Sequence, residues 1–411
     1  MIKKVLINVF IIACTSLIIL SCKNDDDSEG LTNYSFDVIL GLSEFIIVTN
    51  QNKEELYNST SVTSQLTSIQ FDADPEDTID VTYGRSNFLE IYTYRNVSQD
   101  FSIGFERSLF DSVKDRTGPF GNQIFEITGL EGHIVTNPLS GVFIEEDKTI
   151  IRGIGYLGNY SFSVYDEKDN QYKSFVIREE NWIPQGNTDY LVRAHIDDFV
   201  VADRHVIDLN QTSTAWKICA LANQTDGFPV ILDMHNRGFD SSTNLQEGDQ
   251  VEIFIPSNLD FTTIDLKIMS NNIKEGFDYN ERGLIDIPEN ISFKEINPSY
   301  LLFNSREYNV QNDEAFDMVK MTYAFDVIGN SLRSFWHVYQ KSQDTIAYDL
   351  PRLPTEFLST NSVGNTLEQP LYLLSQYYQL ENPLNEDGFE ENVGERIDLQ
   401  NFNLSYKSAD F

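Results

Sequence analysis

The sequence predicts an all-β protein of two or three tandem β-sandwich domains, Ig-like or transthyretin-like, with little helix. The first observation is that short runs of alternating apolar and polar residues recur from residue 31 onward, separated by turns rich in Gly, Asn and Asp. The second is composition. Aromatic residues make up 12% of the 411 residues, with 28 Phe and 20 Tyr, and aromatic side chains favour strands.

Strands with one buried face are expected where apolar residues recur at every second position. In residues 263–270, Ile264, Leu266 and Ile268 are separated from one another by single residues. Residues 87–94 alternate in the same way. Side chains two residues apart lie on the same face of a strand, so this spacing predicts strands that bury one face.

Two hairpins and one helix are also expected. The turns of the hairpins are placed at 166–170 and 50–53, where Asp and Asn tolerate a positive φ. The helix is placed at residues 370–380, where Leu371 and Leu374 have helical spacing and a proline stands at the start.

The chain is expected to divide at its turn-rich and polar stretches. The predicted segments are a signal peptide over 1–21, a lipidated acidic tether over 22–30, a β domain over 31–128, a β-sandwich domain over 129–212, and one or more β domains over 213–411 with a further break near 290–300.

The N-terminus has the features of an export signal. Lys3 and Lys4 precede an apolar run over 5–20, which is shorter than the roughly 20 residues of a membrane-spanning helix. Ile19-Leu20-Ser21-Cys22 then resembles the lipobox of bacterial lipoproteins. This resemblance implies cleavage before Cys22, a diacylglycerol on its thiol and an acylated amine, which together anchor the chain in the outer membrane. The alternative is a cleaved soluble precursor.

The residues after the cysteine are acidic. Asp25, Asp26 and Asp27 resemble the export signal of Bacteroidota surface lipoproteins, which follows the lipidated cysteine directly. The resemblance implies that the body faces the cell exterior. A plain solvated linker is the alternative.

A third resemblance covers residues 132–164. Gly132, Pro138 and Gly141, followed by Tyr160 and Phe162, are similar to the carboxypeptidase regulatory-like β-sandwich. That family implies a non-catalytic sandwich that serves as a spacer or docking module. An unrelated sandwich with similar hairpins is the alternative.

Charge excludes one class of partner. Loss of Lys3 and Lys4 with the signal takes the formal charge from −35 to −37. So acidic a chain is not expected to bind nucleic acid, which is held through Lys and Arg contacts to phosphate, and it repels anionic lipid and acidic polysaccharide.

One cysteine is left for the folded body. After Cys14, which lies in the signal peptide, and Cys22, which is the lipid site, only Cys219 remains. It lies in an apolar run that predicts a buried core residue rather than a nucleophile.

Two groups of residues are candidate metal sites. His195, Asp197 and His205 bring imidazole and carboxylate groups close together in sequence, and His195 and Asp197 would share one face if residues 190–202 formed a strand. Ordinary surface electrostatics is the favoured interpretation. A Ca²⁺ site in the acidic residues of 72–77 is likewise the alternative to a polar turn. The acidic residues concerned are Asp72, Asp74, Glu76 and Asp77.

Trp182 is the candidate ligand-binding residue. It precedes an Ile-Pro-Gln-Gly turn, where an exposed indole could stack on a sugar ring, whereas Trp216 and Trp336 lie in apolar runs and are expected in the core. The favoured function is therefore a surface-anchored, non-catalytic module that binds a glycan or an envelope protein. A hydrolase with a carboxylate or His/Asp site, and an adhesin or structural spacer, are the alternatives.

Overall fold

The structure is a computed structural model that describes part of the chain. The described residues are 31–38, 43–60, 67–85, 90–97, 102–103, 120–136, 142–145, 148–156, 158–186, 189–225, 229–234, 246–270, 275–303, 307–311, 316–326, 333–342, 345–354, 370–380 and 402–410. The predicted signal peptide, Cys22 and the acidic tether lie outside the described residues.

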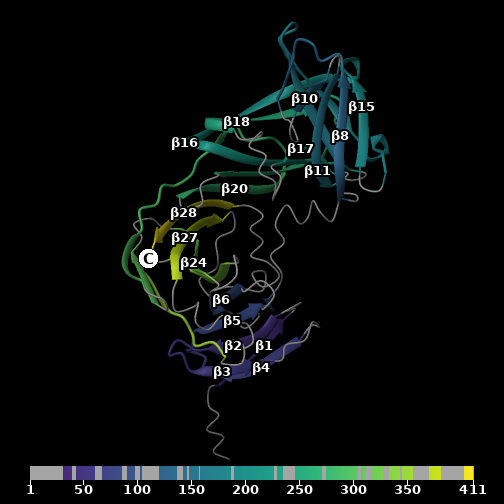
Figure 1. Ribbon diagram of the computed structural model, residues 1–411. Coiled ribbons are helices and arrows are strands. Elements are labelled where there is room, and N and C mark those ends of the chain that lie inside the picture. The colour runs from purple at the N-terminus through teal and green to yellow at the C-terminus, as the bar shows by residue number, and fades with distance from the viewer. Residues whose placement is uncertain are drawn as a thin grey trace, which may run out of the picture.

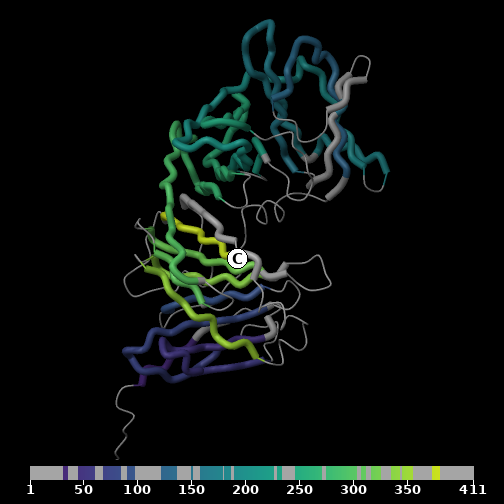
Figure 2. Tube along the Cα trace, turned by 60° about the vertical axis from the view of Figure 1, so that its left-hand side comes forward, coloured from purple at the N-terminus to yellow at the C-terminus, as the bar shows by residue number. Residues whose placement is uncertain are grey.

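The all-β prediction is confirmed. Within the described ranges the secondary structure consists of strands and two short 3-10 turns, η1 (Glu179–Asn181) and η2 (Ile196–Asp198). None of these residues belongs to a helix that could span a membrane. The strands form two lobes, called here the lower lobe (β1–β7 and β22–β28) and the upper lobe (β8–β21), as Figures 1 and 2 show.

A central sheet organises the lower lobe. In spatial order its strands are β3 (Glu55–Ser59), β2 (Ser43–Thr49), β5 (Ile79–Arg85), β6 (Glu90–Val97), β25 (Arg333–Lys341), β24 (Met318–Asp326), β27 (Pro370–Leu380) and β28 (Phe402–Asp410). The pairing of β6 with β25 is parallel and joins residues about 245 positions apart, so strands from both ends of the chain share this sheet.

Each face of the central sheet packs against a smaller sheet. One of these contains β1 (Thr32–Val38), β4 (Thr67–Ala73) and β7 (Ser102–Ile103), and the other β22 (Ser299–Phe303), β23 (Glu307–Gln311) and β26 (Thr345–Asp349). Ile46 and Val48 of β2 belong to the first buried cluster, whereas Phe45 and Ile47 belong to the second. The alternating side chains of one strand therefore supply two cores, which explains the unbroken apolar run from Phe45 to Val48 within β2.

A glycine permits the close approach of one core side chain. Gly84 of β5 lies opposite Phe45 of β2, and a Cβ atom at position 84 would stand 2.2 Å from a carbon of the Phe45 ring. The ring therefore occupies the space that any other residue at position 84 would fill.

Two packed sheets enclose one core of the upper lobe. The first contains β10 (Val142–Glu145), β11 (Lys148–Tyr156), β8 (Phe120–Thr128), β15 (Asp189–His195) and β14 (Ile183–Pro184). Facing it are β9 (His133–Val135), β12 (Asn159–Asp166), β13 (Gln171–Ile177) and β17 (Val230–Met234). Phe125 and Val192 from the first sheet meet Tyr160 and Phe162 from the second in the buried cluster between them.

The long strand β16 (Val200–Asn223) joins this core to a second one. Its first half pairs with β18 (Gln246–Pro256), and its second half pairs with β17 and β19 (Thr263–Ser270). The register with β18 shifts after Asp208 and again after Ser213, where the strand passes from one layer to the next. β20 (Glu275–Leu284) and β21 (Asn290–Ile291) complete this region.

The two lobes share hydrogen-bonded strands. β28, the last described strand, pairs with β27 on one edge and with β20 on the other, and β20 pairs with β19. The predicted cut after residue 128 falls at the end of β8, and the cut after residue 212 falls inside β16. The domain boundaries themselves stay predictions.

Both predicted hairpins are confirmed and the predicted helix is wrong. β12 and β13 pair around a turn in which Asn170 has φ 51°, and β2 and β3 pair around a turn in which Lys53 has φ 65°. Residues 370–380 instead form strand β27. Leu373, Ser375 and Tyr377 are fully buried at every second position, and β24 and β28 pair with both edges, so the period of two prevails over the helical spacing.

Candidate functional site

The three predicted metal ligands do not converge. His195 ends β15, and its Nδ1 lies 3.2 Å from Oδ2 of Asp197 in η2, so the strand expected over 190–202 is interrupted. The His195 N–H donates to the Asp198 side chain, and the Asp197 N–H donates to the His195 ring. His195 therefore caps the start of the 3-10 turn η2. His205 lies in β16 opposite Ile253. Across the described ranges, no group of three His, Cys, Asp or Glu side chains is placed to hold a metal ion.

The expectation that Trp182 is exposed is wrong. The side chain is 7% exposed and packs edge-on against Phe125 and Tyr160 in the core between the two upper sheets. Its Nε1 donates to the carbonyl of Gly158 over 3.1 Å. No indole face is therefore free to stack on a sugar.

The acidic residues proposed for Ca²⁺ take part in a turn between β4 and β5. The backbone N–H of Glu76 donates to Asp74 Oδ1 over 2.9 Å, and Asp77 Oδ2 accepts from the N–H of Asp74 over 3.3 Å. Asp72 accepts from the side chain of Asn33. The carboxylates of Asp72, Asp74 and Asp77 therefore have structural partners, as the polar-turn interpretation expects.

The predictions for the core residues are confirmed. Trp216 is fully buried and Trp336 is 3% exposed. Cys219 is 1% exposed, and burial raises the pKa of its thiol to about 12. A thiol with so high a pKa is a poor nucleophile at neutral pH.

A buried charge pair lies on the sheet formed by β19 and β20. Lys267 Nζ is 3.4 Å from Asp278 Oδ2, and both side chains are less than one fifth exposed. Asp278 Oδ1 is buried and has no hydrogen-bond partner among the described residues. Burial raises the pKa of Asp278 from 3.8 to about 6, although the nearby Lys267 acts in the opposite direction.

This shift predicts a pH-dependent stability. Because folded Asp278 binds its proton more tightly than the unfolded chain does, its contribution is lost as pH rises from about 4 to about 6. Asp278→Asn removes this dependence. The unfolding free energy of the variant relative to wild type should therefore shift in its favour by up to about 3 kcal/mol between pH 4 and pH 7. Urea unfolding at both pH values measures the shift, and parallel behaviour of the two proteins would contradict it.

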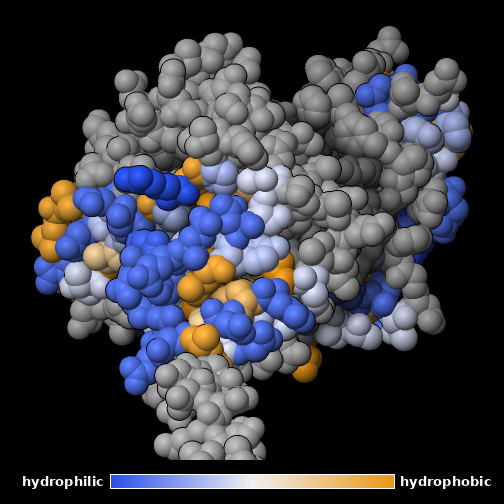
Figure 3. Space-filling model, turned by 90° about the horizontal axis from the view of Figure 1, so that it is seen from below, coloured by the Kyte–Doolittle hydropathy of each residue, from blue (hydrophilic) through white to orange (hydrophobic). Residues whose placement is uncertain are grey.

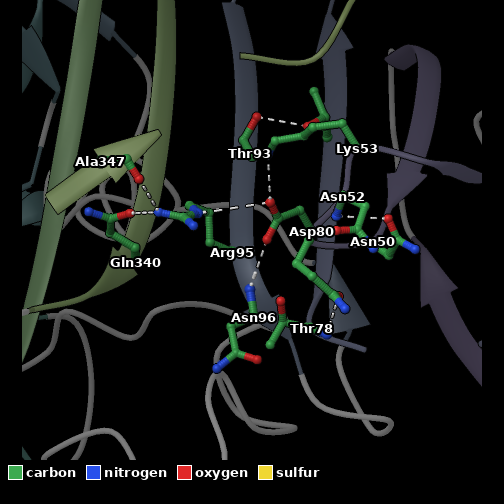
Figure 4. Close-up of polar contacts among 12 residues, drawn as sticks. Asn50, Asn52, Lys53, Thr78, Asp80, Thr93, Arg95, Asn96, Gln340 and Ala347 are labelled. Carbon is green, nitrogen blue, oxygen red and sulfur yellow. Dashed lines mark hydrogen bonds and ion pairs between the residues drawn. The ribbon is translucent and has the colours of Figure 1, made fainter. Parts of the chain in front are cut away.

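A polar cluster joins the central sheet of the lower lobe to the sheet that contains β26 (Figure 4). Asp80 is 3% exposed and lies 3.2 Å from Lys53 Nζ and 3.8 Å from Arg95 Nε. Both cations also lie over the ring of Tyr348, and Arg95 donates to the side chain of Gln340 and to the carbonyl of Ala347. Every charge is engaged within the protein, so this cluster is structural.

A row of side chains on the upper lobe has the properties expected of a binding surface. Ile134 of β9 pairs with Tyr165 of β12, which pairs with Tyr172 of β13. Paired residues project from the same face, so these three side chains form a continuous row. The rings of Tyr165 and Tyr172 lie 5.0 Å apart, and Phe254 of β18 continues the row with its ring 4.7 Å from Tyr172. We call Tyr165, Tyr172 and Phe254, together with Ile134 at their open end, the aromatic row.

The aromatic row is open to solvent at one end and polar at its margin. Ile134 is 51% exposed, Tyr165 and Tyr172 are half-buried, and Phe254 is buried. Burial raises the pKa of Tyr172, and Arg204, whose guanidinium lies 5.8 Å from the centre of the ring, partly offsets the effect. Arg204 itself pairs with Glu252.

Sequence reasoning missed the aromatic row, although a signal for it was present. The turn at 166–170 predicts the hairpin, and the register of that hairpin is the signal. Tyr165 stands just before Asp166 and Tyr172 just after Gln171, so pairing of Asp166 with Gln171 places the tyrosines opposite each other. The contact with Phe254 carries no such local signal, because about 80 residues separate it from Tyr172.

Comparison with known proteins adds no assignment. No family model matches the chain, and no curated protein matches it at a significant level. The aromatic row is therefore the candidate functional site on the strength of its geometry.

Proposed function

We infer that this chain is a surface-exposed lipoprotein of the outer membrane that acts as a non-catalytic binding module, built from two or three tandem Ig-like or transthyretin-like sandwiches. The observation that supports binding most directly is the aromatic row. Tyrosine side chains that remain accessible on a sheet are rigid and amphipathic, and they are favoured at recognition surfaces.

The arrangement of the lobes supports a tethered orientation. β1, which follows the predicted acidic tether, lies in the lower lobe, whereas the aromatic row belongs to the upper lobe (Figure 1). Seen from below, the described surface of the lower lobe is mainly hydrophilic, with small hydrophobic areas between the hydrophilic ones (Figure 3). A body of this kind would lie in water, with Cys22 as its attachment and the upper lobe presented outward.

The hydrolase alternative has less support. The His/Asp site it invokes would need His195, Asp197 and His205 in one place, and His205 lies apart from the other two on β16. Catalytic groups must lie within hydrogen-bond reach of a common substrate. A binding role requires only the exposed surface that the upper lobe offers.

Anchoring is tested by Cys22→Ser. We expect the wild-type chain to take up labelled fatty acid and to sediment with membranes, and the variant to lose both properties, because the thiol is the acyl acceptor. Cys219→Ser is the matched control, since it changes a buried cysteine and should keep label and sedimentation. A Cys22→Ser chain that still carries the label would overturn the lipoprotein assignment.

Orientation is tested with protease on intact cells. The wild-type chain should be degraded, whereas a chain with Asp25, Asp26 and Asp27 all changed to Asn should keep its lipid and become protected. Protection of the wild-type chain would refute the outward orientation.

A further inference from the structure

We propose that the aromatic row binds an uncharged carbohydrate chain, with Tyr165 and Tyr172 as the stacking residues. This inference rests on the proposed binding function and names its ligand class. The accessible part of the row, Ile134, Tyr165 and Tyr172, crosses β9, β12 and β13, a span of roughly 10 Å at the usual spacing between strands, which suits a short stretch of a sugar chain.

The shape of the row fits a sugar polymer. The planes of Tyr165 and Tyr172 are tilted by 46°, so the two accessible rings present differently inclined faces, and buried Phe254 packs against Tyr172. Lys173 pairs with Val201, which places Tyr172 beside Ala202. Ala202 is small, and Phe254 pairs with Arg204 two residues further along β16, so the two rings can meet across that strand. The weakly polarised C–H groups of a sugar ring pack well against such faces.

Polar groups at the margin suit the hydroxyls of a sugar. The Tyr165 hydroxyl donates to Asn170 Oδ1, which fixes the ring and leaves the phenolic oxygen able to accept. Arg204 and Glu252 pair with each other, and their side chains are 40% and 33% exposed. Such a pair can donate to one hydroxyl and accept from another, whereas a purely apolar partner would leave both charges to be desolvated.

Charge selects a neutral ligand. Arg204, the cation that lies over the Tyr172 ring, is paired with Glu252, so it offers no unpaired positive charge to an anionic polymer. The whole chain carries a formal charge of −35, which repels acidic polysaccharides. A neutral carbohydrate needs no positive charge for its binding and is not repelled by the negative charge of the protein.

Affinity electrophoresis of the purified full chain tests the proposal. Native gels would contain amylopectin, galactomannan, xyloglucan or mixed-linkage glucan, with alginate as the anionic comparison. We expect at least one neutral polymer to retard the chain and alginate not to. Tyr165→Ala and Tyr172→Ala should each weaken the retardation about tenfold, as removal of one well-packed ring from an interface commonly does. Tyr172→Phe should retain most of the binding, because it keeps the ring.

Tyr57→Ala is the matched control. Tyr57 is a half-buried tyrosine on β3 of the lower lobe, so the same change is made far from the row and should leave retardation unchanged. Circular dichroism establishes that each variant is folded. The proposal is overturned if no neutral polymer retards the chain, or if Tyr57→Ala weakens binding as much as Tyr172→Ala. It is equally overturned if a photo-crosslinker at position 172 captures only protein on intact cells. These outcomes are independent of lipidation, which Cys22→Ser tests separately.

Discussion

Trp216→Ala should lower the free energy of unfolding by about 3 to 5 kcal/mol, the range typical of removing a large aromatic side chain from a core. Trp216 is fully buried in the second core of the upper lobe and stacks on Phe293 with ring centres 6.0 Å apart. Its Nε1 donates to the carbonyl of Gly248 over 2.8 Å. The substitution therefore leaves both a cavity and a carbonyl without its donor.

The position of Trp216 explains why the loss should be large. It pairs with Gln246 of β18 on one edge of β16 and with Ser270 of β19 on the other, where the two layers separate. Urea unfolding followed by far-ultraviolet circular dichroism measures the effect. Ile285→Ala is the control, because that side chain is 77% exposed and should change stability by less than about 0.5 kcal/mol. A loss below about 1 kcal/mol for Trp216→Ala would contradict the structure of this junction.

Asp80→Ala should cost about 2 to 3 kcal/mol, since removal of one member of a buried ionic cluster leaves the other charges uncompensated. Lys53 and Arg95, which both lie over the Tyr348 ring, would then have no carboxylate to balance their charges, and the backbone N–H of Asn96 would lose an acceptor 3.1 Å away. Both cations are 30% exposed, so solvent screens part of the repulsion and keeps the loss below that of a fully buried pair.

Two measurements distinguish electrostatic repulsion from simple loss of packing as the cause of the Asp80→Ala deficit: its dependence on salt, and the effect of breaking an exposed ion pair. Screening weakens the repulsion between Lys53 and Arg95, so the deficit of Asp80→Ala should shrink when NaCl is raised from 0.05 to about 1 M. Glu126→Gln removes one member of the pair with Arg193, whose side chain is 65% exposed, and should cost less than about 1 kcal/mol. A deficit for Asp80→Ala that is independent of salt would count against the electrostatic explanation.

The strands could be predicted because their signal is local. Ile264, Leu266 and Ile268 alternate in sequence, and all three are buried on one face of β19. The turns at 50–53 and 166–170 were equally accessible, because Asn and Asp favour tight turns. In the first turn Lys53, not an asparagine, takes the positive φ, and the Asn50 side chain accepts from the backbone N–H groups of Asn52 and Glu54.

Residue environments set by distant strands were predicted less well. The turn beside Trp182 suggested exposure, but Phe125 and Tyr160 from two different sheets enclose the indole. Residues 370–380 contain both a helical and a strand spacing, and only the flanking strands β24 and β28 decide between them. Propensity is a weak guide where tertiary contacts supply most of the energy.

The sequence by itself determined that this chain forms strands, where many of them lie, and that Trp216, Trp336 and Cys219 are core residues. Only the tertiary structure decided which strands pair and which faces stay open. β6 meets β25 across about 245 positions, and Phe45 requires a glycine at position 84. The physical reason is that alternation and turn preference depend on neighbours along the chain, whereas sheet order, burial and the aromatic row depend on side chains that meet only after folding.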